Sequence, residues 1–101
     1  MARKAVTMPK PLDFQQVEVM RKHMLIPVSV MAFMLGATRM TYYKWVTGAS
    51  QIRPRREVVV RAQIKKILAI MTEHAWPTPE VVGMESEARI AKLLALFRLY
   101  E

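Results

Sequence analysis

The sequence has no cysteine, two histidines and three glycines. Without cysteine, neither a disulfide framework nor a thiolate metal site can stabilise the fold, so packing of apolar side chains must do so. His23 and His74 form neither an HxxxH nor an HExxH pair, which argues against a metal site. The glycines form neither GxGxxG nor GxxxxGK, the patterns of phosphate-binding loops. We therefore expect no metal, no cofactor and no enzymatic activity.

The sequence also lacks an apolar run long enough for a membrane helix. Residues 23–38 carry no Lys, Arg, Asp or Glu and follow Arg21 and Lys22. This run is shorter than the about 20 residues that span a bilayer. A secretory leader is disfavoured too, because Asp13 and Glu18 precede the run. We expect a cytoplasmic protein that does not insert into a membrane.

Acidic residues are half as numerous as basic ones, 8 against 16, which gives a net charge of +8. Residues 39–66 hold eight basic residues and one acid, a balance of +7, while residues 1–38 sum to +3 and residues 67–101 to −2. A charge run is usually a solvated helix face, but this concentration favours a polyanionic partner, most commonly nucleic acid. The eight basic residues are Arg39, Lys44, Arg53, Arg55, Arg56, Arg61, Lys65 and Lys66.

The apolar spacing predicts an all-α fold of about five helices and no strand. The expected helices cover residues 12–24, 27–35, 38–48, 54–74 and 85–100. Pro27 and Pro54 suit first turns, where a missing N–H costs nothing. Thr38 can cap the third helix through its hydroxyl, and Gly48 can end it because glycine adopts positive φ freely. Apolar stripes are expected on the fourth helix (Val60, Ile64, Ile67, Leu68, Met71) and the last helix (Ile90, Leu93, Leu94, Phe97, Tyr100).

Three parts of the chain follow from this layout. Residues 1–11 read as a flexible basic arm that ends at Pro9 and Pro11, and residues 12–76 form the main helical domain. Residues 77–101 comprise a connector and a C-terminal amphipathic helix that packs on the domain or forms a dimer contact. The stretch WPTPEVVG has two prolines and a glycine, which is typical of a connector.

Residues 26–48 carry the most specific motif, IPVSVMAFMLGATRMTYYKWVTG. It resembles the helix-turn-helix of the lambda-repressor-like (Cro/CI-type) DNA-binding family, without a gap. Tyr42 takes the place of the family's buried aliphatic residue, and Trp45 is expected to anchor the core. The matching helix-packing, turn and capping positions are Met31, Ala32, Leu35, Gly36, Thr38, Thr41, Trp45 and Gly48.

The resemblance implies that residues 38–48 form a recognition helix in the major groove of double-stranded DNA. Residues just after the capping threonine would then contact base edges, namely Arg39, Met40, Tyr43 and Lys44. Arginine can pair bidentately with guanine, and Met40 or a tyrosine ring can contact a thymine methyl group. The implied contacts to phosphate come from the helix ends and the following loop, through Thr38, Thr47, Ser50, Gln51, Arg53, Arg55 and Arg56.

The second helix departs from the family pattern. Val28 stands where a phosphate-contacting glutamine is usual, so that contact is expected to be lost. Val30, Phe33 and Met34 occupy positions that are commonly charged and exposed, which leaves this helix apolar almost all round. A helix of this kind must be covered. The C-terminal helix, a second subunit or another protein could supply the cover, and we expect a homodimer through the C-terminal helix, the apolar second helix or both.

Together these features predict a sequence-specific transcriptional regulator that binds double-stranded DNA. By analogy, it is of the small repressor type that phages and mobile elements encode. One alternative is a protein-interaction module that binds polymerase, a toxin or another regulator through the apolar second helix. Another is a structural nucleoid-type protein without base preference.

Overall fold

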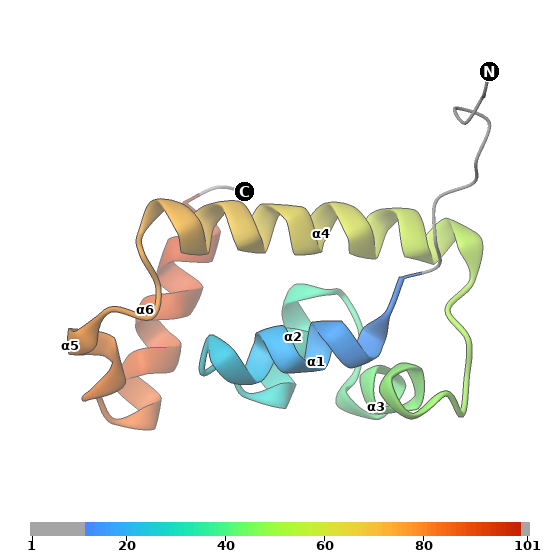
Figure 1. Ribbon diagram of the computed structural model, residues 1–101, viewed down its shortest axis with the longest axis horizontal. Coiled ribbons are helices and arrows are strands. Elements are labelled where there is room, and N and C mark those ends of the chain that lie inside the picture. The colour runs from blue at the N-terminus through green and yellow to red at the C-terminus, as the bar shows by residue number, and fades with distance from the viewer. Residues whose placement is uncertain (1–11, 100–101) are drawn as a thin grey trace, which may run out of the picture.

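The computed structural model describes residues 12–99, and in that range the protein has six helices and no strand. The expectation of an all-α fold is confirmed, although the helix count is six and not five. The expected N-terminal arm and Tyr100 lie outside the described residues. The helices are α1 Phe14–His23, α2 Val28–Met34, α3 Arg39–Thr47, α4 Pro54–Glu73, α5 Pro79–Val82 and α6 Ser86–Arg98 (Figure 1).

The extra helix is α5, a single turn inside the stretch expected to be a connector. Thr78 caps it, because its hydroxyl accepts a hydrogen bond from the Val81 amide at 3.2 Å, and Pro79 occupies the first turn. The Thr78 cap thus starts a helical turn within a stretch whose proline and glycine content predicts only a connector.

Helix boundaries elsewhere follow local capping chemistry. The Asp13 side chain accepts a hydrogen bond from the Gln15 amide at 2.9 Å, so α1 begins at Phe14, two residues later than expected. Pro27 is the N-cap residue of α2 and not its first helical residue. Pro54 begins α4 as expected, and this helix runs 20 residues to Glu73.

The helices share one apolar core (Figure 1). Helix α4 runs along one side of the molecule, with α1 and α2 beside its middle, α3 near its N-terminal end, and α5 and α6 near its C-terminal end. On α4 the buried stripe includes Ile70, whereas Leu68, which was expected to be buried, is 38% exposed. The core members from α1, α2 and α3 are Phe14, Val17, Val30, Met31, Ala32, Met34 and Tyr42.

Trp76 connects the C-terminal part of the chain to the turn between α1 and α2. Its side chain is buried, and its indole N–H donates a hydrogen bond to the Met24 carbonyl at 2.8 Å. On α6, Leu93 and Phe97 are buried in the same core, and the Lys66 ammonium lies 4.8 Å from the centre of the Phe97 ring. The α6 stripe therefore packs on α4 of its own chain.

None of the helices within residues 12–99 is both long and apolar enough to cross a membrane.

Candidate nucleic-acid interface

The start and the end of α3 are fixed by two local devices. The Thr38 hydroxyl accepts a hydrogen bond from the Thr41 amide at 3.1 Å and so caps the helix. Gly36, in the turn before the cap, has φ of 74°, and Gly48, just after the helix, has φ of 82°. Both values lie in the left-handed region that favours glycine. These residues give α3 the bounds expected from the sequence.

The inward face of α3 packs against α1. Tyr42 is fully buried, and its ring meets that of Phe14 edge to face, with centroids 6.4 Å apart. The Trp45 ring also packs against that of Phe14, with centroids 5.1 Å apart, but Trp45 is only partly buried. Trp45, expected to anchor the core, therefore packs against the core at its edge. The Gln15 side chain adds a hydrogen bond to the Val46 carbonyl at 2.5 Å.

A polar network joins the same two helices. The Tyr42 hydroxyl donates a hydrogen bond to Glu18 Oε1 at 2.9 Å. Arg21 donates to both oxygens of that carboxylate, through Nε at 2.8 Å and Nη2 at 2.5 Å, and to the Ile26 carbonyl through Nη1 at 2.8 Å. The network thus ties α3 to α1 and to the turn before α2.

The network also shifts the pKa values of its members. Hydrogen bonding to Arg21 lowers the pKa of Glu18 in spite of the opposing effect of burial. Burial, together with the hydrogen bond to Glu18, raises the pKa of the Tyr42 hydroxyl. Hydrogen bonding to Glu18 raises the pKa of Arg21. The carboxylate is therefore charged and the phenol neutral at pH 7, which suits this arrangement of donors and acceptors.

The outward face of α3 carries the four residues expected to contact bases. Arg39, Met40, Tyr43 and Lys44 are all exposed, and Met40 is 68% exposed. The helix contains no acid. These side chains offer one guanidinium, one ammonium, one phenol and one thioether to a ligand on that face. The composition suits contact with anionic phosphates and base edges.

The residues expected to contact phosphate border the same helix. The loop of residues 48–53 joins α3 to the N-terminal end of α4. The loop, α3 and this end of α4 therefore all lie at one end of the molecule (Figure 1). The Ser50 amide donates to the Lys44 carbonyl at 3.2 Å, which helps to end α3. All seven of the expected residues are exposed: Thr38, Thr47, Ser50, Gln51, Arg53, Arg55 and Arg56.

Some of the basic residues in this part of the chain have partners within the protein. Arg56 donates a hydrogen bond through Nη2 to the Gly36 carbonyl and so links α4 to the turn before α3. Arg61 pairs with Glu57 at 2.9 Å, and Lys66 lies over the Phe97 ring. The charge concentration seen in the sequence is therefore divided between internal contacts and an exposed group around α3. That group comprises Arg39, Lys44, Arg53 and Arg55.

Helix α2 is largely covered by the chain itself. Val30 and Met34 are buried, and Gln63 on α4 donates a hydrogen bond to the Met34 carbonyl at 3.1 Å. Phe33 remains 65% exposed, and Val28 is partly buried. The chain itself therefore covers Val30 and Met34. The sequence alone had left open whether the C-terminal helix, a second subunit or another protein would cover them.

The comparisons with protein-family models, with curated proteins and with solved structures found no match. The case for this site therefore depends on its residues and their geometry.

Proposed function

We propose that the protein binds double-stranded DNA and regulates transcription by placing α3 in the major groove. The observation that supports this most is the composition of the outward face of α3. Arginine, lysine, methionine and tyrosine side chains are exposed there, and the helix contains no Asp or Glu. An α-helix fits the major groove, and these side chain types can read base edges there. The exposed Arg53 and Arg55 beside α3 suit contacts to phosphate, which position the protein without reading sequence.

The rest of α3 supports this role, because its geometry is fixed before any ligand arrives. The Thr38 cap, the buried Tyr42 and the hydrogen bond to Glu18 hold the helix on α1. A side chain that reads a base needs such a rigid support, since bidentate hydrogen bonds tolerate little displacement. The proposed mode of binding is that of the small helix-turn-helix repressors.

The experiment is an in vitro selection from random duplexes, followed by gel retardation of the selected site at several salt concentrations. We expect log K to fall steeply with log salt, because bound cations are released from the DNA. The selected site should bind roughly a thousandfold or more tightly than random DNA. Equal affinities would favour a nucleoid-type protein, and a failure to retard any duplex at low salt would refute the proposal.

Arg39→Ala is the matched test of the reading face. It should cost about 1 to 3 kcal/mol of binding to the selected site and relax the preference at one base pair, because it removes a bidentate donor. Arg98→Ala is the control, since Arg98 is an exposed arginine on α6, a helix that packs on α4 and does not lie beside α3 (Figure 1). If both variants lost the same affinity, the effect would be one of net charge, and Arg39 would not read a base.

The alternative of a protein-interaction module on α2 has less support. Because Val30 and Met34 are buried, α2 lacks the continuous apolar surface that this function requires. Phe33 alone among the large apolar side chains of α2 is exposed.

A further inference from the structure

The N-terminal end of α4 and its cap residue carry two of the proposed phosphate contacts but place no side chain in the core. Arg53 and Arg55 are exposed, and none of residues 53–59 is buried. The first buried side chain of α4 is that of Val60. A helix end without buried side chains opens readily, because few contacts are lost when it does so. Contacts outside the core must therefore hold these arginines beside α3.

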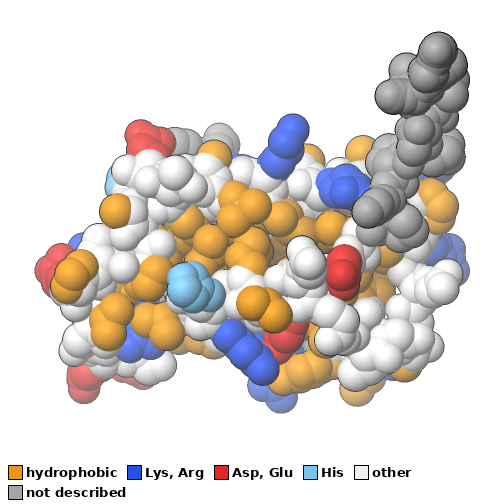
Figure 2. Space-filling view, viewed as in Figure 1, with side chains coloured by type: hydrophobic (Ala, Val, Ile, Leu, Met, Phe, Trp, Pro, Cys, Tyr) orange, Lys and Arg blue, Asp and Glu red, His pale blue; other side chains and the backbone are white. Residues whose placement is uncertain are grey.

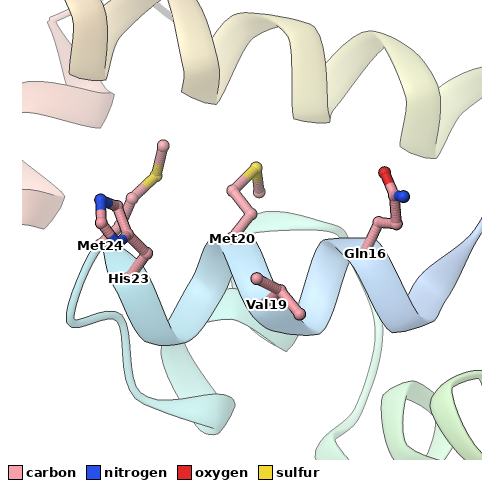
Figure 3. Close-up of a pocket in the computed structure, with 5 residues that line it drawn as sticks. All are labelled: Gln16, Val19, Met20, His23 and Met24. Carbon is pink, nitrogen blue, oxygen red and sulfur yellow. The ribbon is translucent and has the colours of Figure 1, made fainter.

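Packing between α1 and α4 is open as well. A hollow of about 260 Å³ between the two helices is lined by Met20 and Ile64 among others, and hollows of about 460 and 430 Å³ share lining residues with it. Figure 2 shows apolar side chains gathered between α1 and α4, and in Figure 3 Gln16, Met20 and Met24 extend from α1 towards α4. Hollows lack van der Waals contacts, so packing here holds the two helices less firmly than a filled interface would.

Glu57 supplies a polar link at the N-terminal ends of both helices. Its Oε2 accepts a hydrogen bond of 2.7 Å from the amide of Leu12, the residue before the Asp13 cap of α1. The same oxygen accepts one of 2.9 Å from Arg61, one turn further along α4. Glu57 lies in the first turn of its helix, where a negative charge is favourable. The single acid of residues 39–66 thus joins α4 to the start of α1.

We infer that Glu57 is a positioning residue for the DNA contact, which holds Arg53 and Arg55 in place relative to α3. This inference rests on the proposed function. Helix α3 packs on α1 through Phe14, and Glu57 fixes the start of α1 on the first turn of α4. Arg56 makes a second link, from α4 to the turn before α3. The base contacts and the phosphate contacts are therefore joined by side chains as well as by the loop between them.

A further hollow, of about 310 Å³, gives this end of α4 room to move if the link is lost. Its lining comes from the start of α1, from α3, from the loop of residues 48–53 and from α4. The lining residues are Leu12, Phe14, Trp45, Gly48, Ser50, Gln51, Ile52 and Glu57, and Glu57 is the one charged residue among them. Without the hydrogen bond to Leu12, the loop and the arginines that follow it can shift into this space.

Glu57→Gln and Glu57→Ala separate positioning from charge. Both remove the same negative charge beside the DNA contact, which by itself should strengthen binding to any duplex. Glutamine keeps an amide oxygen that can accept the hydrogen bond from Leu12, whereas alanine has no acceptor. We expect Glu57→Ala to bind the selected site and random duplexes roughly threefold to tenfold more weakly than Glu57→Gln, the factor that one hydrogen bond contributes. Its salt slope should be lower by up to about two, one for each arginine.

The base preference provides a second readout. Glu57→Ala should keep the preference of the wild-type protein, because α3 stays packed on α1 and contacts to phosphate carry no sequence information. A loss of preference would mean that the substitution disturbs α3 itself, and it would overturn a role limited to the phosphate contacts. Binding is measured at a temperature at which circular dichroism shows both variants fully folded.

Amide hydrogen exchange of the free protein tests the contact without DNA. The Leu12 amide should exchange faster in Glu57→Ala than in the wild-type protein and should stay protected in Glu57→Gln. Glu87→Ala is the control, since it removes the same charge from an exposed position on α6 and should leave the exchange of Leu12 unchanged. Unchanged exchange of Leu12 in Glu57→Ala would overturn the inference.

The DNA measurements distinguish the two proposals. Equal affinities of Glu57→Ala and Glu57→Gln would mean that Glu57 acts through its charge alone, which overturns the inference and leaves the proposed function intact. If the wild-type protein retarded no duplex at low salt, the proposed function would fail and the positioning role with it.

Discussion

Removing the hydroxyl of Tyr42 tests how α3 is held in place. Tyr42→Phe keeps the buried ring and its contact with Phe14, so it creates no cavity. It removes one hydrogen bond of 2.9 Å to the Glu18 carboxylate. Hydrogen bonds to charged groups contribute about 1.5 to 3 kcal/mol. We expect the lower end, about 1.5 kcal/mol, because Arg21 still donates to both oxygens of Glu18.

Urea unfolding followed by circular dichroism at pH 7 measures this loss. For a domain of this size, about 1.5 kcal/mol corresponds to a fall in Tm of roughly 6 to 12 °C. Tyr43→Phe is the matched control, since Tyr43 is the neighbouring tyrosine on the exposed face of α3, and it should leave the free energy of unfolding unchanged. In a double-mutant cycle with Glu18→Gln, we expect a coupling of about 1 kcal/mol.

The same variant gives a signature at high pH. The pKa of Tyr42 is raised in the folded protein above its ordinary value of 10.0, so its stabilising contribution is complete below pH 10 and is lost as the pH rises further. Tyr42→Phe should abolish this part of the alkaline destabilisation. If Tyr42→Phe and Tyr43→Phe were equally stable at pH 7, the hydroxyl would not hold α3, and the reasoning from the network would be wrong.

Three further predictions follow from the same contacts. Because the pKa of Glu18 is lowered from 4.5, its contribution is present above about pH 4.5 and is lost as the pH falls through the folded value, so Glu18→Gln should reduce the dependence of Tm on pH below that point. Trp45→Ala should cost less than about 3 kcal/mol of unfolding free energy, because Trp45 is only partly buried against Phe14; a loss of 3 to 5 kcal/mol would mean that it is a core residue. Arg55→Ala should weaken binding to all duplexes and lower the salt slope by about one, whereas Arg56→Ala should also lower Tm, because it releases the turn before α3; equal Tm values would contradict the role of that contact.

Local chemistry explains which parts of the fold could be predicted. Thr38 and Gly48 act on the residues next to them, so the start and the end of α3 can be read from the sequence. Pro54 begins α4 for the same reason. The outward position of Arg39 and Tyr43 follows from helical spacing once Tyr42 points inward. These features need no knowledge of where other helices lie.

Contacts between distant residues could not be predicted in this way. The hydrogen bond from Tyr42 to Glu18 spans 24 positions, and that from Trp76 to Met24 spans 52. Arg56, which is exposed and is expected to contact phosphate, also donates through Nη2 to a carbonyl 20 positions earlier. Composition shows that a basic side chain is present and not which acceptor lies within its reach. The exposure of Leu68 has a similar origin, because it depends on how far apart α1 and α4 lie.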